Sequence, residues 1–315
     1  MAIVVYAESQ NGEFKKNAFE ALSYGKLISK NTNQALVALT INAKDPSSLA
    51  NYGPDKILSI IDSSLDQFTA QNYANIISQY SKDLNVTILV MSSSVDSKYI
   101  APLISVQLGA GLASNVVSEP LNYNPLKVKR SCFTNKAYNH TVMKSKINIL
   151  CVSNNSFGVN ESKSDPEIIK SNDFIKDDKI KVEAIDRLSG SVSIADADIV
   201  VSGGRGLKGP ENWHLIEDLA STLGAATACS KPVSDMGWRP HSEHVGQTGK
   251  PVSSNLYIAI GVSGAIQHLA GINSSKVKVV INTDPDAPFF KAADYGIIGD
   301  AFEVLPKLTE KLKAR

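Results

Sequence analysis

Short hydrophobic runs alternate with longer amphipathic segments over the first hundred residues. Apolar runs that predict buried strands lie at residues 2–7, 35–41, 56–61 and 86–91. Segments with the spacing of amphipathic helices lie at residues 14–29, 69–80 and 98–108. Strands that alternate with helices are typical of βαβ units. The pattern therefore predicts an α/β domain with a mostly parallel sheet flanked by helices.

The pattern changes after Gly109. Short strand-like runs follow at residues 116–117, 127–133, 137–143 and 147–152, and we expect them to pair antiparallel at the edge of the first sheet. Residues 154–178 are polar and predict a surface loop, whereas 181–186 predict one more strand. A linker at 189–195 then divides the chain near residue 190. The predicted domains are 1–190 and 191–315.

The second domain has a strand and a glycine turn at its start and a fuller version of the same pattern near its end. Residues 198–202 form an apolar run before Gly203-Gly204-Arg205-Gly206, where glycine amides and the arginine favour an anion. A glycine turn with a solvated arginine explains this segment equally well. The stretch 256–282 predicts a strand, a Gly-Ser-Gly turn, a helix start and a second strand. Strand ends and a helix start that converge predict a ligand crevice, although an ordinary βα turn remains the alternative.

Composition excludes several functions. Lys+Arg 32 against Asp+Glu 31 gives a net charge of +1, which implies no nucleic-acid binding and no anionic-membrane attraction. The 3 cysteines lack C-x-x-C spacing, which argues against a disulfide framework, a zinc site or an iron–sulfur cluster. With no targeting segment and no apolar run long enough to cross a bilayer, we expect a cytoplasmic protein without direct membrane insertion.

Candidate chemistry is sparse. His241, Glu243 and His244 lie close together, but they lack the i, i+4 pairing of a zinc helix and sit in a loop. Residues 246–249 that follow are interpreted as a polar turn that offers an amide, a hydroxyl and exposed backbone. Lys231 follows a strand end, where it either faces a ligand or is simply solvated. His268 lies in the ligand turn, with a core histidine as the alternative. The residues suggest no nucleophile–base pair and no paired-carboxylate site.

Several motifs occur in order over the last 120 or so residues. They are SGGRGLK, ACSKPVSDMGW, VGQTGK, LYIAIGVSGAIQHLAG and INTDPDAPFFKAADYGIIGD. Together they closely resemble the FAD-binding domain of the electron-transfer flavoprotein alpha (large) subunit. The first domain is similar to the same family more weakly, over its whole length. The resemblance implies a Rossmann-like C-terminal FAD-binding domain.

The resemblance also implies a set of cofactor-binding residues. Arg205 would lie near the flavin, Ser230 and Lys231 along its ring edge, and Thr248 near N5. His268 is expected near the C2 carbonyl, and Asn282 with Asp300 at the adenosine. The full set is Arg205, Ser230, Lys231, Val245, Gly246, Gln247, Thr248, Ser263, Gly264, Ala265, Ile266, Gln267, His268, Asn282, Asp300 and Ala301. Where the family usually has Ser-Arg, this chain has Ser230-Lys231, which keeps the charge but loses arginine's planar fork.

By the same resemblance the chain would be the alpha subunit of a heterodimer with one FAD, paired with a beta subunit that holds AMP and packs against domain 1–190. It would accept electrons from flavin dehydrogenases, such as the acyl-CoA dehydrogenases of fatty acid beta-oxidation, and pass them through the FAD semiquinone to a quinone oxidoreductase. Donors and cations such as His268 and Lys231 would stabilise the half-reduced flavin. The alternatives are an electron-bifurcating or nitrogen-fixation variant, a self-contained flavin- or NAD-dependent oxidoreductase, and an adenine-nucleotide sensor that uses the first domain.

Overall fold

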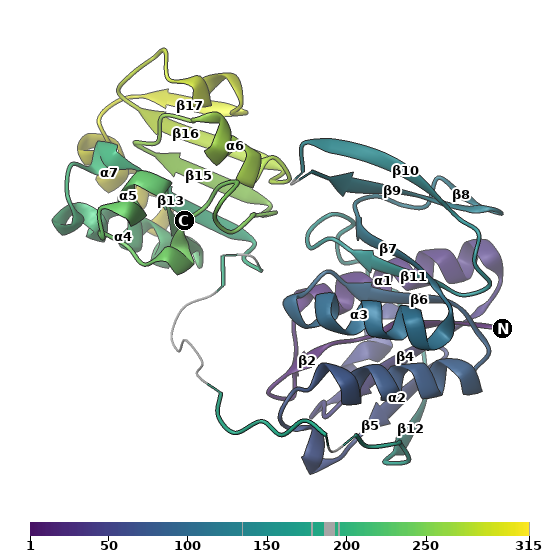
Figure 1. The fold of residues 1–315 in the computed structure, drawn as a ribbon. Coiled ribbons are helices and arrows are strands. Elements are labelled where there is room, and N and C mark those ends of the chain that lie inside the picture. Colours follow the sequence, from purple (N-terminus) through teal and green to yellow (C-terminus); the bar gives the residue numbers. More distant parts are fainter. Residues whose placement is uncertain (134, 178, 186–192, 195, 315) are drawn as a thin grey trace. The chain divides into compact units, whose positions relative to one another are not determined.

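The computed structural model describes residues 1–133, 135–177, 179–185, 193–194 and 196–314. They form two compact units, 1–131 with 138–186, and 132–137 with 187–315. The predicted boundary near residue 190 lies outside the described residues, as does most of the predicted linker. Each unit is an α/β domain with a mostly parallel sheet flanked by helices, which confirms the predicted fold class (Figure 1).

The first unit is built on a ten-stranded sheet in the order β10-β9-β7-β11-β6-β1-β4-β5-β12, with β8 beside β9. Its strands are β1 (Ala2–Tyr6), β4 (Ala35–Ile41), β5 (Lys56–Ile60), β6 (Val86–Ser92), β7 (Gly111–Val116), β8 (Asn122–Tyr123), β9 (Leu126–Cys132), β10 (Ala137–Met143), β11 (Asn148–Val152) and β12 (Glu167–Ser171). A small hairpin, β2 (Ser9–Gln10) with β3 (Glu13–Phe14), follows β1.

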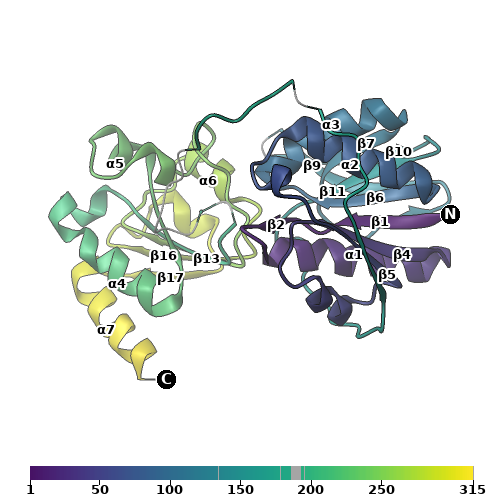
Figure 2. The ribbon, with the colours of Figure 1, turned by 90° about the horizontal axis from the view of Figure 1, so that it is seen from below.

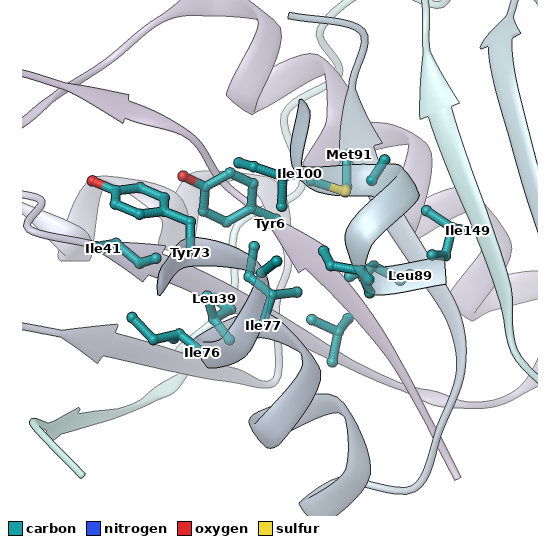
Figure 3. Packing of buried hydrophobic residues seen from close by; sticks show 14 of the residues in the cluster. Tyr6, Leu39, Ile41, Tyr73, Ile76, Ile77, Leu89, Met91, Ile100 and Ile149 are labelled. Atoms are coloured by element: carbon teal, nitrogen blue, oxygen red, sulfur yellow. The ribbon is translucent and has the colours of Figure 1, made fainter. Parts of the chain in front are cut away.

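Helices cover both faces of this sheet. They are α1 (Lys16–Thr32), α2 (Ala70–Asp83) and α3 (Val95–Leu108), with the 3-10 turns η1 (Pro46–Tyr52) and η2 (Ser63–Leu65). Alternate residues of β1 serve opposite faces: Val4 and Tyr6 pack with α2 and α3 in the cluster of Figure 3, whereas Ile3 and Val5 pack with α1. Burial on both faces explains why the strands are continuous hydrophobic runs.

Two predictions for the first unit are wrong. Residues 148–152 form no edge strand: β11 lies inside the sheet, parallel to both β6 and β7, and all its residues are buried. Of the other predicted edge runs, β10 and β9 do lie at this end of the sheet, and β9 pairs antiparallel with β7. Strand β12 lies at Glu167–Ser171, within the predicted loop, and pairs parallel with β5 at the edge of the sheet. Residues 181–185, which were predicted to form a strand, do not form one.

The second unit has a five-stranded, fully parallel sheet in the order β14-β13-β15-β16-β17 (Figure 2). Its strands are β13 (Ile199–Gly203), β14 (Ala226–Cys229), β15 (Leu256–Ile260), β16 (Val277–Asn282) and β17 (Tyr295–Ile298). Its helices are α4 (His214–Leu223), α5 (Lys231–Asp235), α6 (Ile266–Ile272) and α7 (Ala301–Lys313), with 3-10 turns η3 (Arg205–Leu207), η4 (Pro210–Trp213), η5 (His241–Glu243) and η6 (Pro288–Lys291). Among the described residues, no helix combines the length and apolar character needed to cross a bilayer.

Strand register in the second unit brings four strand ends to one level. Gly203 pairs with both Cys229 and Ile260, and Ile260 pairs in turn with Ile281. The residues that follow these positions therefore leave the sheet together at its carboxyl edge. In an open parallel sheet this edge is where ligands bind.

Candidate functional site

A cavity of about 510 Å³ opens at this carboxyl edge, within the second unit. Its walls come from the turns after β13, β14, β15 and β16 and from the loop that precedes β15. The volume lies in the range of small-molecule and cofactor sites, which is ~300–1,000 Å³. The cavity is thus the leading candidate for a ligand site in the second unit.

Glycines after β13 and β15 let two turns touch through their backbones. A Cβ on Gly204 would lie 2.1 Å from the Gly261 carbonyl oxygen, and one on Gly206 would lie 2.6 Å from the Gly261 Cα. The Gly204 and Gly206 amides donate to the carbonyls of Ile260 and Gly261 at 2.8 and 3.1 Å. The expectation that these amides are exposed for an anion is therefore wrong, because they bond the neighbouring turn. What the turn presents at the cavity is Arg205.

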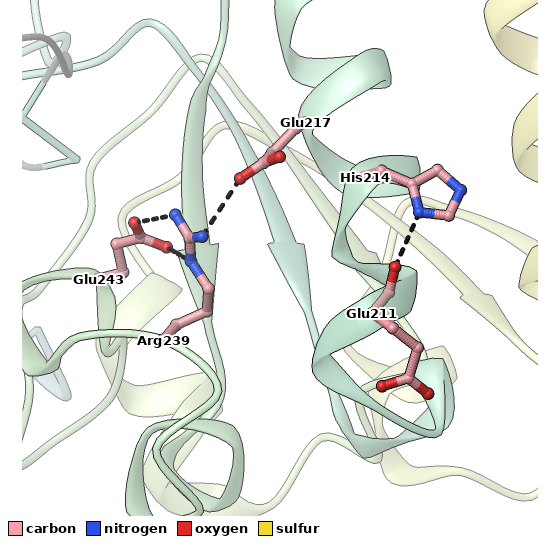
Figure 4. A network of polar contacts seen from close by, with 5 residues as sticks. All are labelled: Glu211, His214, Glu217, Arg239 and Glu243. Carbon is pink, nitrogen blue, oxygen red and sulfur yellow. Dashed lines mark hydrogen bonds and ion pairs between the residues drawn. The ribbon is translucent and has the colours of Figure 1, made fainter.

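An ionic clamp ties the loop before β15, of which residues 244–248 line the cavity, to α4 (Figure 4). Arg239 donates to both carboxylate oxygens of Glu243, at 2.9 and 2.6 Å, and also to Glu217 of α4 at 3.2 Å. Its guanidinium lies 5.4 Å from the Trp213 ring centroid. Hydrogen bonding to Glu243 raises the pKa of Arg239. A fork-to-fork pair of this kind fixes geometry as well as charge.

Beyond the clamp the loop crosses the ligand turn. The Gln247 amide donates to the Gln267 carbonyl at 2.7 Å, which ties the loop to α6. A Cβ on Gly271 would lie 2.6 Å from the Gly246 Cα, so helix and loop meet backbone to backbone. Gln247 and Thr248 remain exposed at the cavity. The loop therefore places an amide and a hydroxyl there on a fixed backbone.

His268 lies at the base of the cavity and is 6% exposed. Its Nε2 is 2.9 Å from the Tyr257 hydroxyl of β15, and its Nδ1 is buried without a hydrogen-bond partner. Burial lowers the pKa of His268 to about 4, with His244 adding to the effect and the Val245 backbone opposing it. His268 is therefore neutral near pH 7 in this structure. Nε2 is thus engaged with Tyr257, whereas the hydrogen-bonding capacity of Nδ1 is unsatisfied in this structure.

The cavity wall is positively charged. Arg205 and Lys231 are exposed there, and the described lining includes no aspartate or glutamate. Lys231 begins α5 directly after Ser230, whose amide donates to the Gly203 carbonyl at 3.1 Å. Two cations without a counter-charge favour an anionic ligand.

The structure brings most of the predicted site residues to this cavity. Those that line it are Arg205, Ser230, Lys231, Val245, Gly246, Gln247, Thr248, Ser263, Ala265, Gln267, His268 and Asn282. Asn282 also ties two turns together, because its Nδ2 donates to the Val262 carbonyl at 3.1 Å.

Four predicted residues do not line the cavity. Gly264 is buried at φ +84° against Phe289, and Ile266 is 78% exposed at the start of α6. Asp300 is the N-cap of α7, where its carboxylate accepts from the Phe302 amide at 3.0 Å and lies 3.5 Å from Lys208. Ala301 is buried behind it.

Five lining residues were not predicted: Gly206, Pro232, His244, Gly261 and Val262. Gly261 and Val262 directly follow the end of β15, so their place at the carboxyl edge of the sheet could have predicted that they line the cavity. The sequence pattern places His244 in a loop beside His241 and Glu243, and no group of three metal-binding side chains occurs among the described residues. Its place in the cavity wall depends on a loop whose course the sequence pattern does not predict.

The residues present fit a flavin nucleotide. Val245, Val262 and Pro232 give the cavity apolar wall, as a fused ring requires, while Arg205 and Lys231 suit its phosphates and its polar edge. The apposed glycine backbones keep the carboxyl edge clear of side chains. The described donor set contains amides, a hydroxyl and cations, which suit the polar edge and phosphates of such a ligand.

Family comparisons agree with this description. Residues 193–273 match the family described as the electron transfer flavoprotein FAD-binding domain, and residues 3–173 match the electron transfer flavoprotein domain. A flavin-binding α/β electron carrier is therefore the class that the fold and cavity define. The chain belongs to the electron-transfer flavoprotein alpha subunit family.

Three relatives illustrate the membership. The electron transfer flavoprotein subunit alpha of Bacillus subtilis is 33% identical over 315 residues, covering 99% of this chain and 97% of the relative. Protein FixB of Clostridium saccharobutylicum is 30% identical over 98% of this chain and 95% of the relative. The mitochondrial subunit alpha of Dictyostelium discoideum is 50% identical over 140 residues, 44% of this chain and 39% of the relative.

Proposed function

We propose that this chain is the alpha subunit of a heterodimeric electron carrier that holds one FAD in the cavity of its second unit. It accepts electrons from flavin dehydrogenases, such as acyl-CoA dehydrogenases, and passes them to a quinone oxidoreductase. Its partner is a smaller beta subunit that carries AMP. The first unit packs against that partner, and the predicted sixteen residues with Arg205 and Lys231 among them form the FAD site.

One observation carries this proposal. The cavity at the carboxyl edge combines two uncompensated cations, Arg205 and Lys231, with apolar walls in a region that matches an FAD-binding family domain. An anionic, largely flat cofactor satisfies both features. FAD, once bound, supplies the redox chemistry, and the protein supplies binding and electrostatics.

Each wall of the cavity contributes separately. Arg205 and Lys231 stabilise negative charge, which favours reduction of a bound ring over its oxidised form. Thr248 and Gln247 offer a hydroxyl and an amide on a clamped loop. Val245 and Val262 exclude water from the ring face. Lys231 replaces the arginine usual in the family, so it acts as a point charge without the planar fork.

A self-contained oxidoreductase is disfavoured by the same cavity. Such an enzyme needs an acid–base group beside the ring. The described lining offers only His244 and His268 as candidate acid–base groups, and the Nε2 of His268 is engaged with Tyr257. Electron shuttling requires no such group.

A nucleotide sensor in the first unit is disfavoured by Glu8. The chain leaves β1 at this residue, and its carboxylate accepts hydrogen bonds from Ser94, the N-cap of α3, and from Ser92 at 3.3 Å. Burial raises the pKa of Glu8. A helix N-terminus at a strand edge is where a phosphate would bind, and here a carboxylate occupies it.

Co-expression with a candidate beta subunit, followed by an absorption spectrum, tests the proposal. We expect a yellow heterodimer whose colour is FAD, and we expect Arg205→Ala and Thr248→Met to weaken FAD retention or shift its potential. Lys311→Ala, an exposed cation on α7, is the matched control and should change neither. A colourless heterodimer would refute the function, and unchanged FAD affinity and potential in both variants would remove those two positions from the site.

A further inference from the structure

His244 is held rigidly at the edge of the cavity by its backbone. Its segment bridges to Cys229 at the end of β14, its amide donates to the His241 carbonyl at 3.2 Å, and its carbonyl accepts from the Lys250 amide at 2.9 Å. A Cβ on Gly249 would lie 2.9 Å from the His244 Cγ. The imidazole therefore occupies space that a glycine leaves open, on a loop already fixed by the clamp of Arg239.

The His244 ring faces the cavity with its polar atoms unpaired. The residue is 3% exposed and lines the cavity, and its ring has no hydrogen-bond partner among the described residues. Neither ring nitrogen is sealed from water, in contrast to the buried Nδ1 of His268. Of the two histidines in the wall, His244 is thus the one that can exchange a proton with the cavity.

Charged and titratable groups face His244 from several elements. They are Lys231 and Asp235 of α5, His241 of η5, and His268 of α6. The His241 and His244 ring centroids are 6.1 Å apart. Lys231 and His241 disfavour a second positive charge, whereas Asp235 favours it. Burial is the largest influence on the ring, and together with these charges it lowers the pKa of His244.

We propose that His244 is the proton acceptor of this cavity, taking up one proton from solvent when the cofactor held there gains one electron. The inference rests on the proposed function. The electron comes from a one-electron donor and stays on the ring, and the proton forms an N–H bond on the imidazole. The charges of the added electron and the added proton cancel, and reoxidation returns the proton to solvent.

The electrostatics agree with this geometry. Burial, followed by His241, lowers the pKa of His244 below 6.5. An added negative charge in the cavity raises it again, because opposite charges at close range favour the protonated form. At pH values between the pKa of His244 with the oxidised cofactor and its pKa with the reduced cofactor, reduction and protonation are linked. The equilibrium constant for reduction should then fall up to tenfold per pH unit as the pH rises, which is about 59 mV for one electron.

The test uses the FAD-loaded heterodimer titrated with dithionite between pH 5.5 and 8.5, and compares wild type with His244→Gln. His214→Gln, an exposed histidine of α4, is the matched control. We expect the equilibrium constant of the first reduction step to depend on pH in wild type and in His214→Gln. This pH dependence should be lost in His244→Gln. The spectrum of the reduced ring should be that of the anion, because the proton is on the protein.

A second measurement does not depend on the variant folding. The proton NMR signal of the His244 ring in the wild-type protein, followed without FAD and then with oxidised and reduced FAD, should titrate with a protonation constant that rises at least tenfold on reduction. A pH dependence retained in His244→Gln, or a constant unchanged on reduction, would overturn the inference while leaving FAD binding intact. A colourless wild type would instead remove the proposed function and the inference together.

Discussion

The Tyr257 hydroxyl lies 2.9 Å from the His268 Nε2, and both side chains are buried beneath the cavity. Tyr257 belongs to β15 and His268 to α6, so the bond joins a central strand to the ligand turn. Phe289 stacks on Tyr257 with an interplanar angle of 6°. Because burial raises the pKa of Tyr257, its hydroxyl keeps its proton and can donate to Nε2. The strand thereby sets the orientation of His268.

Tyr257→Phe removes this donor and leaves the buried Nε2 unpaired. We expect a loss of about 1–3 kcal/mol in the free energy of unfolding, the usual cost of an orphaned buried polar group. Urea denaturation measures it. Tyr295→Phe is the control: that ring is 67% exposed, and its change should stay within about 0.5 kcal/mol. Equal values for the two variants would show that the hydrogen bond contributes nothing.

The buried state of His268 should make the second unit sensitive to acid. With a folded pKa of about 4 and an unfolded value of about 6.5, the unfolded chain binds a proton that the folded chain excludes. The contribution of His268 to the free energy of unfolding is therefore fully present above pH 6.5. It is lost as the pH drops towards 4, and the loss is on the order of 3 kcal/mol. Urea unfolding of wild type and His268→Asn at several pH values tests this. The variant should show a shallower slope, and parallel slopes would contradict the prediction.

The ionic clamp should contribute more than an ordinary surface pair. Arg239→Ala leaves Glu243, whose side chain is 16% exposed, without its two charge-assisted hydrogen bonds. We expect a loss of about 1.5–3 kcal/mol in the free energy of unfolding and weaker retention of FAD. Glu217→Gln removes the exposed arm of the network and should cost no more than about 1 kcal/mol. If both variants lose the same stability, the bidentate geometry has no special role.

Two glycines with left-handed backbones separate conformational strain from steric overlap. Gly264 has φ +84°, and a Cβ there would lie 2.4 Å from the Phe289 backbone nitrogen, whereas Gly224 has φ +62° and open space around it. Gly224→Ala should cost about 1 kcal/mol from the backbone alone. Gly264→Ala should cost clearly more, about 3 kcal/mol or above, and disturb the cavity. Thermal unfolding of both variants makes the comparison, and similar costs would refute the steric argument.

The local pattern of apolar and polar residues was sufficient to predict the secondary structure of individual segments. Residues 256–260 are apolar and bounded by turn residues, and they form β15 with only Leu256 incompletely buried. Residues 147–152 look the same locally, but their place at the centre of the sheet depends on pairing with β6 and β7. Hydrophobic periodicity reports burial and carries no information about which strand is the neighbour.

The amino-acid sequence by itself determined the α/β class, the positions of most strands and the glycine turns of the second unit, because these depend on residues adjacent in the chain. Tertiary structure alone decided that Cys229, Gly203, Ile260 and Ile281 end at one level and that His244 joins the cavity wall. It also decided that the Gly204 and Gly206 amides bond a neighbouring turn. These contacts join segments tens of residues apart, and burial and register, which set pKa and pairing, exist only once the sheet has formed.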